Sequence, residues 1–257
     1  MSKVVFAIGA HPDDIEFMMA GTLMLLGEAG YEMHYMTVAN GSGGSSTTDR
    51  AETIAIRAVE SRNAAAAVGA THHEPLVDDI QIYYTPELVA RLCAVVRQVD
   101  PEIMLIPSPQ DYMEDHMNTS RLAVTAAFCR NVQNFATDPA TEAVNTQAAL
   151  YHGQPWGLKD QLRNTIQPHL FVDITSMAER KRQALACHRS QKEWLDVSQG
   201  TDSYLDSMSE MSAEVGRMSG RFEHAEGWRR HLHGGLADSE AFDPLAEALG
   251  ELVAFPQ

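Results

Sequence analysis

The chain has 257 residues, of which 44% are hydrophobic and 21% charged, and its formal net charge is −16. This length and composition are typical of one globular α/β domain, so we expect a single domain over 1–257. A charge of this sign repels nucleic acid and anionic membrane surfaces, and we expect neither as a partner. The three cysteines are dispersed, no apolar run reaches membrane-spanning length, and the chain opens on a strand pattern rather than a signal sequence. We therefore expect free thiols and a cytoplasmic protein.

The first predicted strand ends in a cluster of metal-binding side chains. Residues 4–8 are apolar and end at a glycine, which is typical of a buried parallel strand followed by a loop. Residues 10–14 read Ala-His-Pro-Asp-Asp, and open α/β sheets place their ligands at such strand ends. His11 and Asp14 can turn toward one metal ion while Asp13 acts on a bound water. The alternative is that the carboxylates only cap the helix that follows.

The middle of the chain alternates between strand and helix patterns. Strands are predicted at 31–39 and 103–106, and amphipathic helices at 51–68 and 86–99. This alternation predicts a Rossmann-like α/β fold, with a mainly parallel sheet and helices on both faces. No G-x-G-x-x-G follows the first strand, which argues against a dinucleotide site. The Gly- and Ser-rich loop at 40–46 lies at the same sheet edge as the first cluster, where it is either a plain linker or a substrate-facing loop.

A second polar cluster follows the strand that ends before Pro107. Residues 110–116 read Gln-Asp-Tyr-Met-Glu-Asp-His, and in a parallel sheet this loop can face the first cluster. His116 can then supply the third ligand, and two histidines with one carboxylate are typical of a catalytic zinc site. We expect Asp115 to orient a ligand or the substrate. The alternative is a solvated acidic loop that leads into a helix at 119–132.

The last third of the chain has weaker patterns. Short strands are predicted at 148–151 and 170–174, and a helix at 177–194. Residues 195–257 carry a methionine-rich stripe at helical spacing and a final amphipathic helix at 238–255. We therefore predict a helical C-terminal extension whose stripe belongs to the core or to a subunit contact.

The motifs resemble the PIG-L/LmbE family of zinc-dependent de-N-acetylases. The matching segments are residues 10–16, Gly21 with Thr22, Arg57 with Glu60, 115–116, 171–175, Lys181 and 220–228. The later segments are similar to the bacillithiol-biosynthesis branch of that family. The resemblance implies a Rossmann-like domain of the PIG-L/LmbE type that tends to form homo-oligomers.

The resemblance also implies a role for each member of the two clusters and for one arginine. It implies that Zn²⁺ is bound by three ligands, His11, Asp14 and His116. It implies catalytic roles for Asp13, as the general base, and for Asp115. It also implies that Arg57 contacts the substrate. The implied reaction removes the N-acetyl group from an N-acetylglucosamine-type conjugate and releases acetate. The expected partner is therefore a small amino-sugar substrate.

One position departs from the family pattern. Where the family reads His-Pro-Asp-His, this chain has Met113 and Glu114 in the first two places. Methionine has no proton to donate, so another group takes the role of that histidine, or the chain is a weak or silent zinc-containing protein that binds a sugar or a partner. Tyr112, His152 and His224 are the candidates to take that role in contact with the substrate, and the sequence does not choose among them. A metal-dependent phosphoesterase would suit two metals, whereas we find ligands for one.

Overall fold

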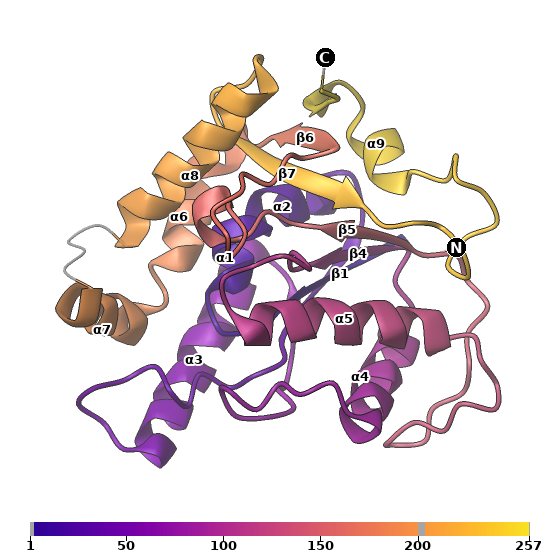
Figure 1. Ribbon diagram of the computed structural model, residues 1–257, viewed down its shortest axis with the longest axis horizontal. Helices are drawn as coiled ribbons and strands as arrows, with labels where there is room; N and C mark the ends of the chain where they lie inside the picture. Colours follow the sequence, from indigo (N-terminus) through magenta and orange to yellow (C-terminus); the bar gives the residue numbers. More distant parts are fainter. Residues whose placement is uncertain (1–2, 200–203, 257) are drawn as a thin grey trace.

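The computed structural model describes residues 3–199 and 204–256 (Figure 1). Within them an eight-stranded sheet has the order β3-β2-β1-β4-β5-β7-β6-β8. The strands are β1 (Val4–Gly9), β2 (Glu32–Thr37), β3 (Thr71–His73), β4 (Ile103–Ile106), β5 (Ala149–His152), β6 (Leu170–Asp173), β7 (Ala225–Arg230) and β8 (Val253–Ala254). Strands β3, β2, β1, β4 and β5 run parallel, and β7, β6 and β8 extend the sheet with antiparallel pairs. The predicted α/β class is confirmed.

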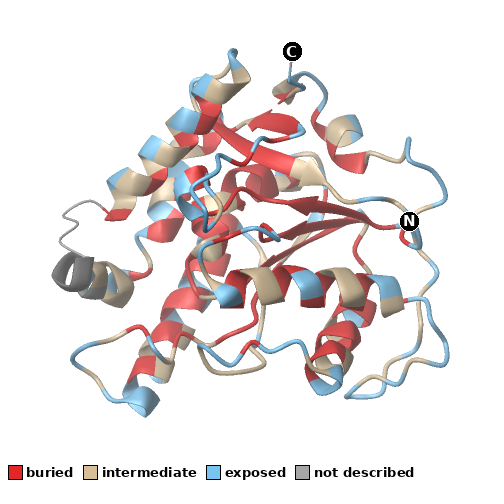
Figure 2. Cartoon of the chain, in the orientation of Figure 1, coloured by how far each residue is buried: buried red, intermediate tan, exposed pale blue. Residues whose placement is uncertain are grey.

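Helices cover both faces of this sheet. They are α1 (Asp14–Met18), α2 (Ala20–Glu28), α3 (Arg50–Val68), α4 (Pro86–Val99), α5 (Glu114–Cys129), α6 (Ala178–Leu185), α7 (Arg189–Gln199), α8 (Tyr204–Ser219) and α9 (Pro244–Leu249). Because side chains alternate along a strand, Val5 and Ala7 of β1 pack in one core with α2, α6 and α9. Phe6 and Ile8 pack in the other core with α4 and α5. Figure 2 shows the central strands as buried between these layers.

Local signals explain the helix ends that the sequence located well. The Asp49 side chain accepts a hydrogen bond from the Glu52 backbone N–H at the start of α3. Thr85 caps α4 in the same way, directly before a proline in the first turn. Gly69 ends α3 with a positive φ of 85°. No helix among the described residues combines the length and apolar character needed to cross a membrane.

The helix that carries the second cluster begins earlier than predicted. It was expected at 119–132, whereas α5 spans Glu114–Cys129, so that His116 lies in its first turn. The first residues of α5 are polar and present no apolar stripe, so hydrophobic periodicity could not reveal them. The helix predicted at 177–194 is also divided, into α6 and α7.

The C-terminal region is not a helical extension. Of the predicted segment 195–257, residues 200–203 and 257 lie outside the described residues. In the rest, β7 lies between β5 and β6 in the sheet, and the helix predicted at 238–255 is reduced to α9 followed by a short turn and β8. Strand β7 reads Ala-Glu-Gly-Trp-Arg-Arg, which has no apolar run, yet its Trp228 is completely buried. The pairing of β7 on both edges, and not its own sequence pattern, makes it a strand.

The methionine-rich stripe of α8 packs inward. Met208 is buried against Phe17 and Leu185 of α1 and α6. Val215, three residues before Met218, packs in a second small cluster with residues of β6 and β7. Of the two roles predicted for the stripe, the structure therefore assigns it to the core.

Candidate active site

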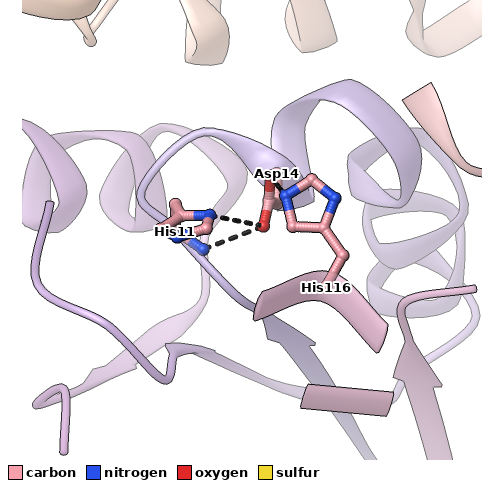
Figure 3. Close-up of side chains that lie close together, drawn as sticks. All are labelled: His11, Asp14 and His116. Atoms are coloured by element: carbon pink, nitrogen blue, oxygen red, sulfur yellow. Dashed lines mark hydrogen bonds and ion pairs between the residues drawn. The ribbon is translucent and has the colours of Figure 1, made fainter. Parts of the chain in front are cut away.

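The two polar clusters meet at one edge of the sheet. Strands β1 and β4 are parallel neighbours, so the loops at their carboxyl ends lie side by side. The metal-binding atoms of His11, Asp14 and His116 all lie within 4.8 Å of one another (Figure 3). The Asp14 Oδ2 atom accepts hydrogen bonds of 2.8 Å from two backbone N–H groups, those of Ala10 and His11. The turn thus holds the carboxylate between the two imidazole rings.

A carboxylate lies behind each histidine of this cluster. The His11 Nε2 atom is 2.9 Å from Asp115 Oδ2, and the His116 Nδ1 atom is 3.0 Å from Asp111 Oδ1. A carboxylate bonded to one ring nitrogen orients the ring and leaves the other nitrogen to a metal. The free nitrogens are the ones near Asp14: His11 Nδ1 is 3.8 Å and His116 Nε2 3.4 Å from its oxygens.

These contacts place Asp115 and reveal Asp111. Asp115 accepts a second hydrogen bond of 2.7 Å from the Ile80 N–H, and it is absent from the described residues that line the pocket. Its geometry is that of a group that orients His11, which matches the orienting role expected for it, and its catalytic role stays a prediction. Asp111 was not singled out by the sequence. The sequence signal that could have identified it is an acidic residue five positions before His116, in the loop that follows β4.

The electrostatics of the cluster favour a cation. Burial lowers the pKa of His116, but the charges of Asp14 and Asp111 outweigh this effect and raise it to about 9. Burial also lowers the pKa of His11, but the hydrogen bond to Asp115 and the charge of Asp14 outweigh this effect. The pKa of His11 is therefore raised above its ordinary value. The ring nitrogens therefore sit in a strongly negative field. Imidazole and carboxylate donors in such a field suit a divalent metal such as zinc.

The predicted general base lies beside the cluster, buried in the first turn. Asp13 has a positive φ of 111°, which is uncommon for a residue other than glycine. Its Oδ2 atom accepts a 2.6 Å hydrogen bond from the Tyr204 hydroxyl and is 3.7 Å from the Arg57 guanidinium. Burial raises the pKa of Asp13, against the opposing charge of Arg57. A raised pKa suits a carboxylate that must take up and release a proton.

Arg57 reaches this site from α3 and is almost completely buried. Besides facing Asp13, it donates to the Pro12 carbonyl oxygen and forms an ion pair of 3.2 Å with Glu60. Glu60 in turn accepts hydrogen bonds from the N–H and hydroxyl groups of Ser190, near the start of α7. Arg57 lines the pocket, so the structure brings this predicted residue to the site, where it also ties three elements together.

A pocket of about 420 Å³ opens above the cluster, a volume in the range of small-ligand sites. Its rim carries two exposed aromatic rings, Tyr112 and Trp156, with centroids 6.0 Å apart. The Tyr112 ring also meets His116 edge-on at 5.6 Å. Gly43 and Gly44 line another side, so of the two roles considered for the loop at 40–46 its position matches the substrate-facing one.

Two of the three predicted substrate contacts lie elsewhere. His152 donates from Nδ1 to the Pro107 carbonyl oxygen, and its Nε2 is 2.9 Å from His231 Nδ1. His224 lies in the turn between α8 and β7, where its N–H donates to the Thr175 hydroxyl oxygen. Neither is among the described residues that line the pocket, so the structure does not support these two predictions. Tyr112 is the candidate that it places there.

Comparisons with known proteins find similarity to de-N-acetylases and to a hydratase. The PIG-L family model, described as GlcNAc-PI de-N-acetylase, matches residues 6–127. Diacetylchitobiose deacetylase of Thermococcus kodakarensis is 28% identical over 235 residues, which are 88% of this chain and 82% of that protein. 4-Oxalmesaconate hydratase of Pseudomonas putida is 26% identical over 202 residues, 74% of each chain. The structure of N,N′-diacetylchitobiose deacetylase from Pyrococcus horikoshii matches with a TM-score of 0.75 and 23% identity, covering 95% of this chain and 89% of that one.

The segment matched by the family model contains both polar clusters, from His11 to His116. The similar structure covers 95% of the chain, and so extends well beyond that segment. The similarity to the bacillithiol-biosynthesis branch stays a prediction. The wider resemblance is confirmed: residues 6–127 of the chain are similar to the PIG-L family of de-N-acetylases.

Proposed function

We propose that this protein is a zinc-dependent hydrolase that removes the N-acetyl group of an N-acetylglucosamine-type conjugate and releases acetate. The observation that carries the proposal is the convergence of His11, Asp14 and His116 at the floor of a pocket, with the Asp13 carboxylate beside them. Two histidines and one carboxylate leave a coordination position open, as catalytic zinc sites do. The similarity to a diacetylchitobiose deacetylase supports the substrate class.

The residues around the cluster suit amide hydrolysis. Zinc, when bound by this donor set, supplies an acidified water and polarises the amide carbonyl. Asp13 accepts the proton of the attacking water, and its buried position favours returning that proton to the leaving amine. The Tyr112 hydroxyl, at the rim of the pocket, is the candidate donor to the developing oxyanion in place of the missing histidine.

The similarity to 4-oxalmesaconate hydratase raises a second reaction class for the same fold. Among the described residues that line the pocket, the acids Asp13, Asp14, Asp79 and Asp111 outnumber the arginine, Arg57. That arginine is already paired with carboxylates. A pocket with this balance suits a neutral N-acetyl sugar better than a carboxylate substrate. We therefore favour the deacetylase over the hydratase.

The first test measures metal content and acetate release together. We expect the purified protein to hold about one zinc per chain and to release acetate from a panel of N-acetylglucosaminides, with activity lost on chelation and restored by zinc. His116→Ala should lose the metal, and Asp13→Ala should keep it while losing turnover. Zinc without turnover on any member of the panel would favour the silent binding protein, and water addition to an unsaturated acid would favour the hydratase.

The substrate partner and the oligomeric state of the protein are also proposals. We propose a small amino sugar as the partner and a homo-oligomeric assembly. The assembly rests on the family resemblance alone, because the α8 stripe is used in the core. Light scattering on the purified chain measures it directly.

A further inference from the structure

A tyrosine far from both sequence clusters contacts the predicted general base. Tyr204 is the first residue of α8, and its hydroxyl donates to Asp13 Oδ2 at 2.6 Å, across 191 positions of the chain. It lies outside the segment that the family model matches. No sequence motif pointed to it, so its role has to be inferred from the contact.

The ring of Tyr204 is held firmly in place. It is 3% exposed and packs in a small core with Phe17, Leu185 and Met208. Its ring meets that of Phe17 edge-on, with centroids 5.2 Å apart. A buried ring with these neighbours has little rotational freedom, so the hydroxyl is a fixed donor rather than an adaptable one.

Both contacts of the Asp13 carboxylate fall on the same oxygen. Tyr204 donates to Oδ2, and the Arg57 guanidinium faces Oδ2 as well. Within the described residues, Oδ1 has no hydrogen bond or ion pair. The carboxylate is therefore held through Oδ2, while Oδ1 remains available to the pocket that Asp13 lines.

The backbone at this position needs such support. The positive φ of Asp13 is a strained conformation that persists where neighbouring groups hold it. Arg57 holds the preceding carbonyl, that of Pro12, and Tyr204 holds the side chain. A general base acts well only if its oxygen is kept in the productive geometry, and a misplacement of about 1 Å can cost 10²-fold in rate.

We propose that Tyr204 is a positioning residue that turns the Asp13 carboxylate so that Oδ1 faces the reacting water. The inference rests on the proposed hydrolase function. It also assigns the C-terminal half of the chain a part in the site, because α8 delivers the hydroxyl.

The test compares two tyrosine variants that each remove one buried hydroxyl. Tyr204→Phe should lower kcat by about 10- to 100-fold, with KM within about twofold and zinc content unchanged. Tyr35→Phe is the matched control, since Tyr35 is also buried but donates to Glu16 and does not line the pocket. We expect it to retain the wild-type kcat. An unchanged kcat in Tyr204→Phe, an equal loss in both variants, or a raised KM at constant kcat would overturn the proposal.

A second readout does not depend on activity. Urea unfolding of the metal-free protein is measured for Tyr204→Phe, Asp13→Asn and the double variant. The contact predicts that the double variant loses less stability than the two single losses added together. Additive losses would overturn the proposal even if the kinetic results agreed with it. Wild type without acetate release, together with a clear coupling, would instead overturn the proposed function and with it the catalytic role of the contact.

Discussion

At the scale of single residues, the site depends on the carboxylates that orient the proposed metal ligands as well as on those ligands. Asp111 and Asp115 each bond one ring nitrogen, so each histidine can present its other nitrogen to the proposed metal. Asp115 is further fixed by the Ile80 N–H, whose residue has a positive φ of 62°. A β-branched residue is seldom found in that conformation. The loop before α4 thus accepts local strain in order to hold a carboxylate behind His11.

Asp111→Asn tests this arrangement at one histidine. The amide can still bond the ring but supplies no charge, so His116 becomes a poorer ligand. We expect zinc affinity to fall about 10- to 100-fold, measured by competition with a chromophoric chelator. Asp79→Asn is the control, because Asp79 also lines the pocket but bonds the backbone N–H groups of Gly41 and Gly43. Equal affinities for Asp111→Asn and wild type would mean that His116 needs no orienting carboxylate.

At the scale of elements, a buried ion pair joins three segments that the sequence left separate. Lys181 of α6 is 2.7 Å from Glu226 of β7, and both side chains are buried. The carboxylate also accepts hydrogen bonds from Gly21 and Thr22, in the first turn of α2. A negative charge at that end of a helix is favourable. These contacts fix β7 against α6 and α2.

Lys181→Ala should therefore destabilise the fold strongly. It leaves the Glu226 carboxylate buried without its counter-charge, for which we expect a loss of about 3–5 kcal/mol in the free energy of unfolding. Urea denaturation measures it. The neighbouring Arg180 provides the matched control, since its pair with Glu28 is exposed. Arg180→Ala should cost less than about 1 kcal/mol, and similar losses in the two variants would show that the buried pair has no special role.

At the scale of the whole molecule, buried histidines make stability depend on pH. Burial lowers the pKa of His152 to about 4, and the charge of the neighbouring His231 acts in the same direction. Burial also lowers the pKa of His73, which lies beside His34, to about 4. In the unfolded chain a histidine titrates near its ordinary value, about 6.5. Between these values the unfolded state binds more protons, so stability falls as the pH falls from about 6.5 to 4.

His152→Gln tests the contribution of the more deeply buried of these two histidines. The group accounts for roughly 3 kcal/mol at most between the two pH limits. We expect the wild type to lose more stability than the variant when urea unfolding is compared at pH 7 and pH 4.5. His169→Gln, at an exposed position, controls for the loss of any imidazole. The same pH dependence in the wild type and in His152→Gln would contradict the assignment.

Much of the fold and half of the site could be predicted because their signals are local. The parallel strands β1, β2 and β4 and the helices α3 and α4 each carry an apolar pattern of the right period with a cap or a breaking residue at the end. The candidate metal ligands lie at the carboxyl ends of two of those strands: His11 and Asp14 in the turn after β1, and His116 in the first turn of the helix that follows β4. Strand β7 could not be predicted in this way, because its residues are mostly polar or small and its partners come from distant segments.

The sequence by itself therefore determined the α/β class, the strand ends at which the polar clusters lie and the donor types that they offer. All of these follow from residue chemistry over a few neighbouring positions. Only the tertiary structure decided that Asp111 and Asp115 stand behind the histidines, that His152 and His224 lie outside the pocket, and that Tyr204 reaches Asp13. Such contacts join residues through the packing of whole elements, and a distance across 191 positions leaves no periodic trace in the chain.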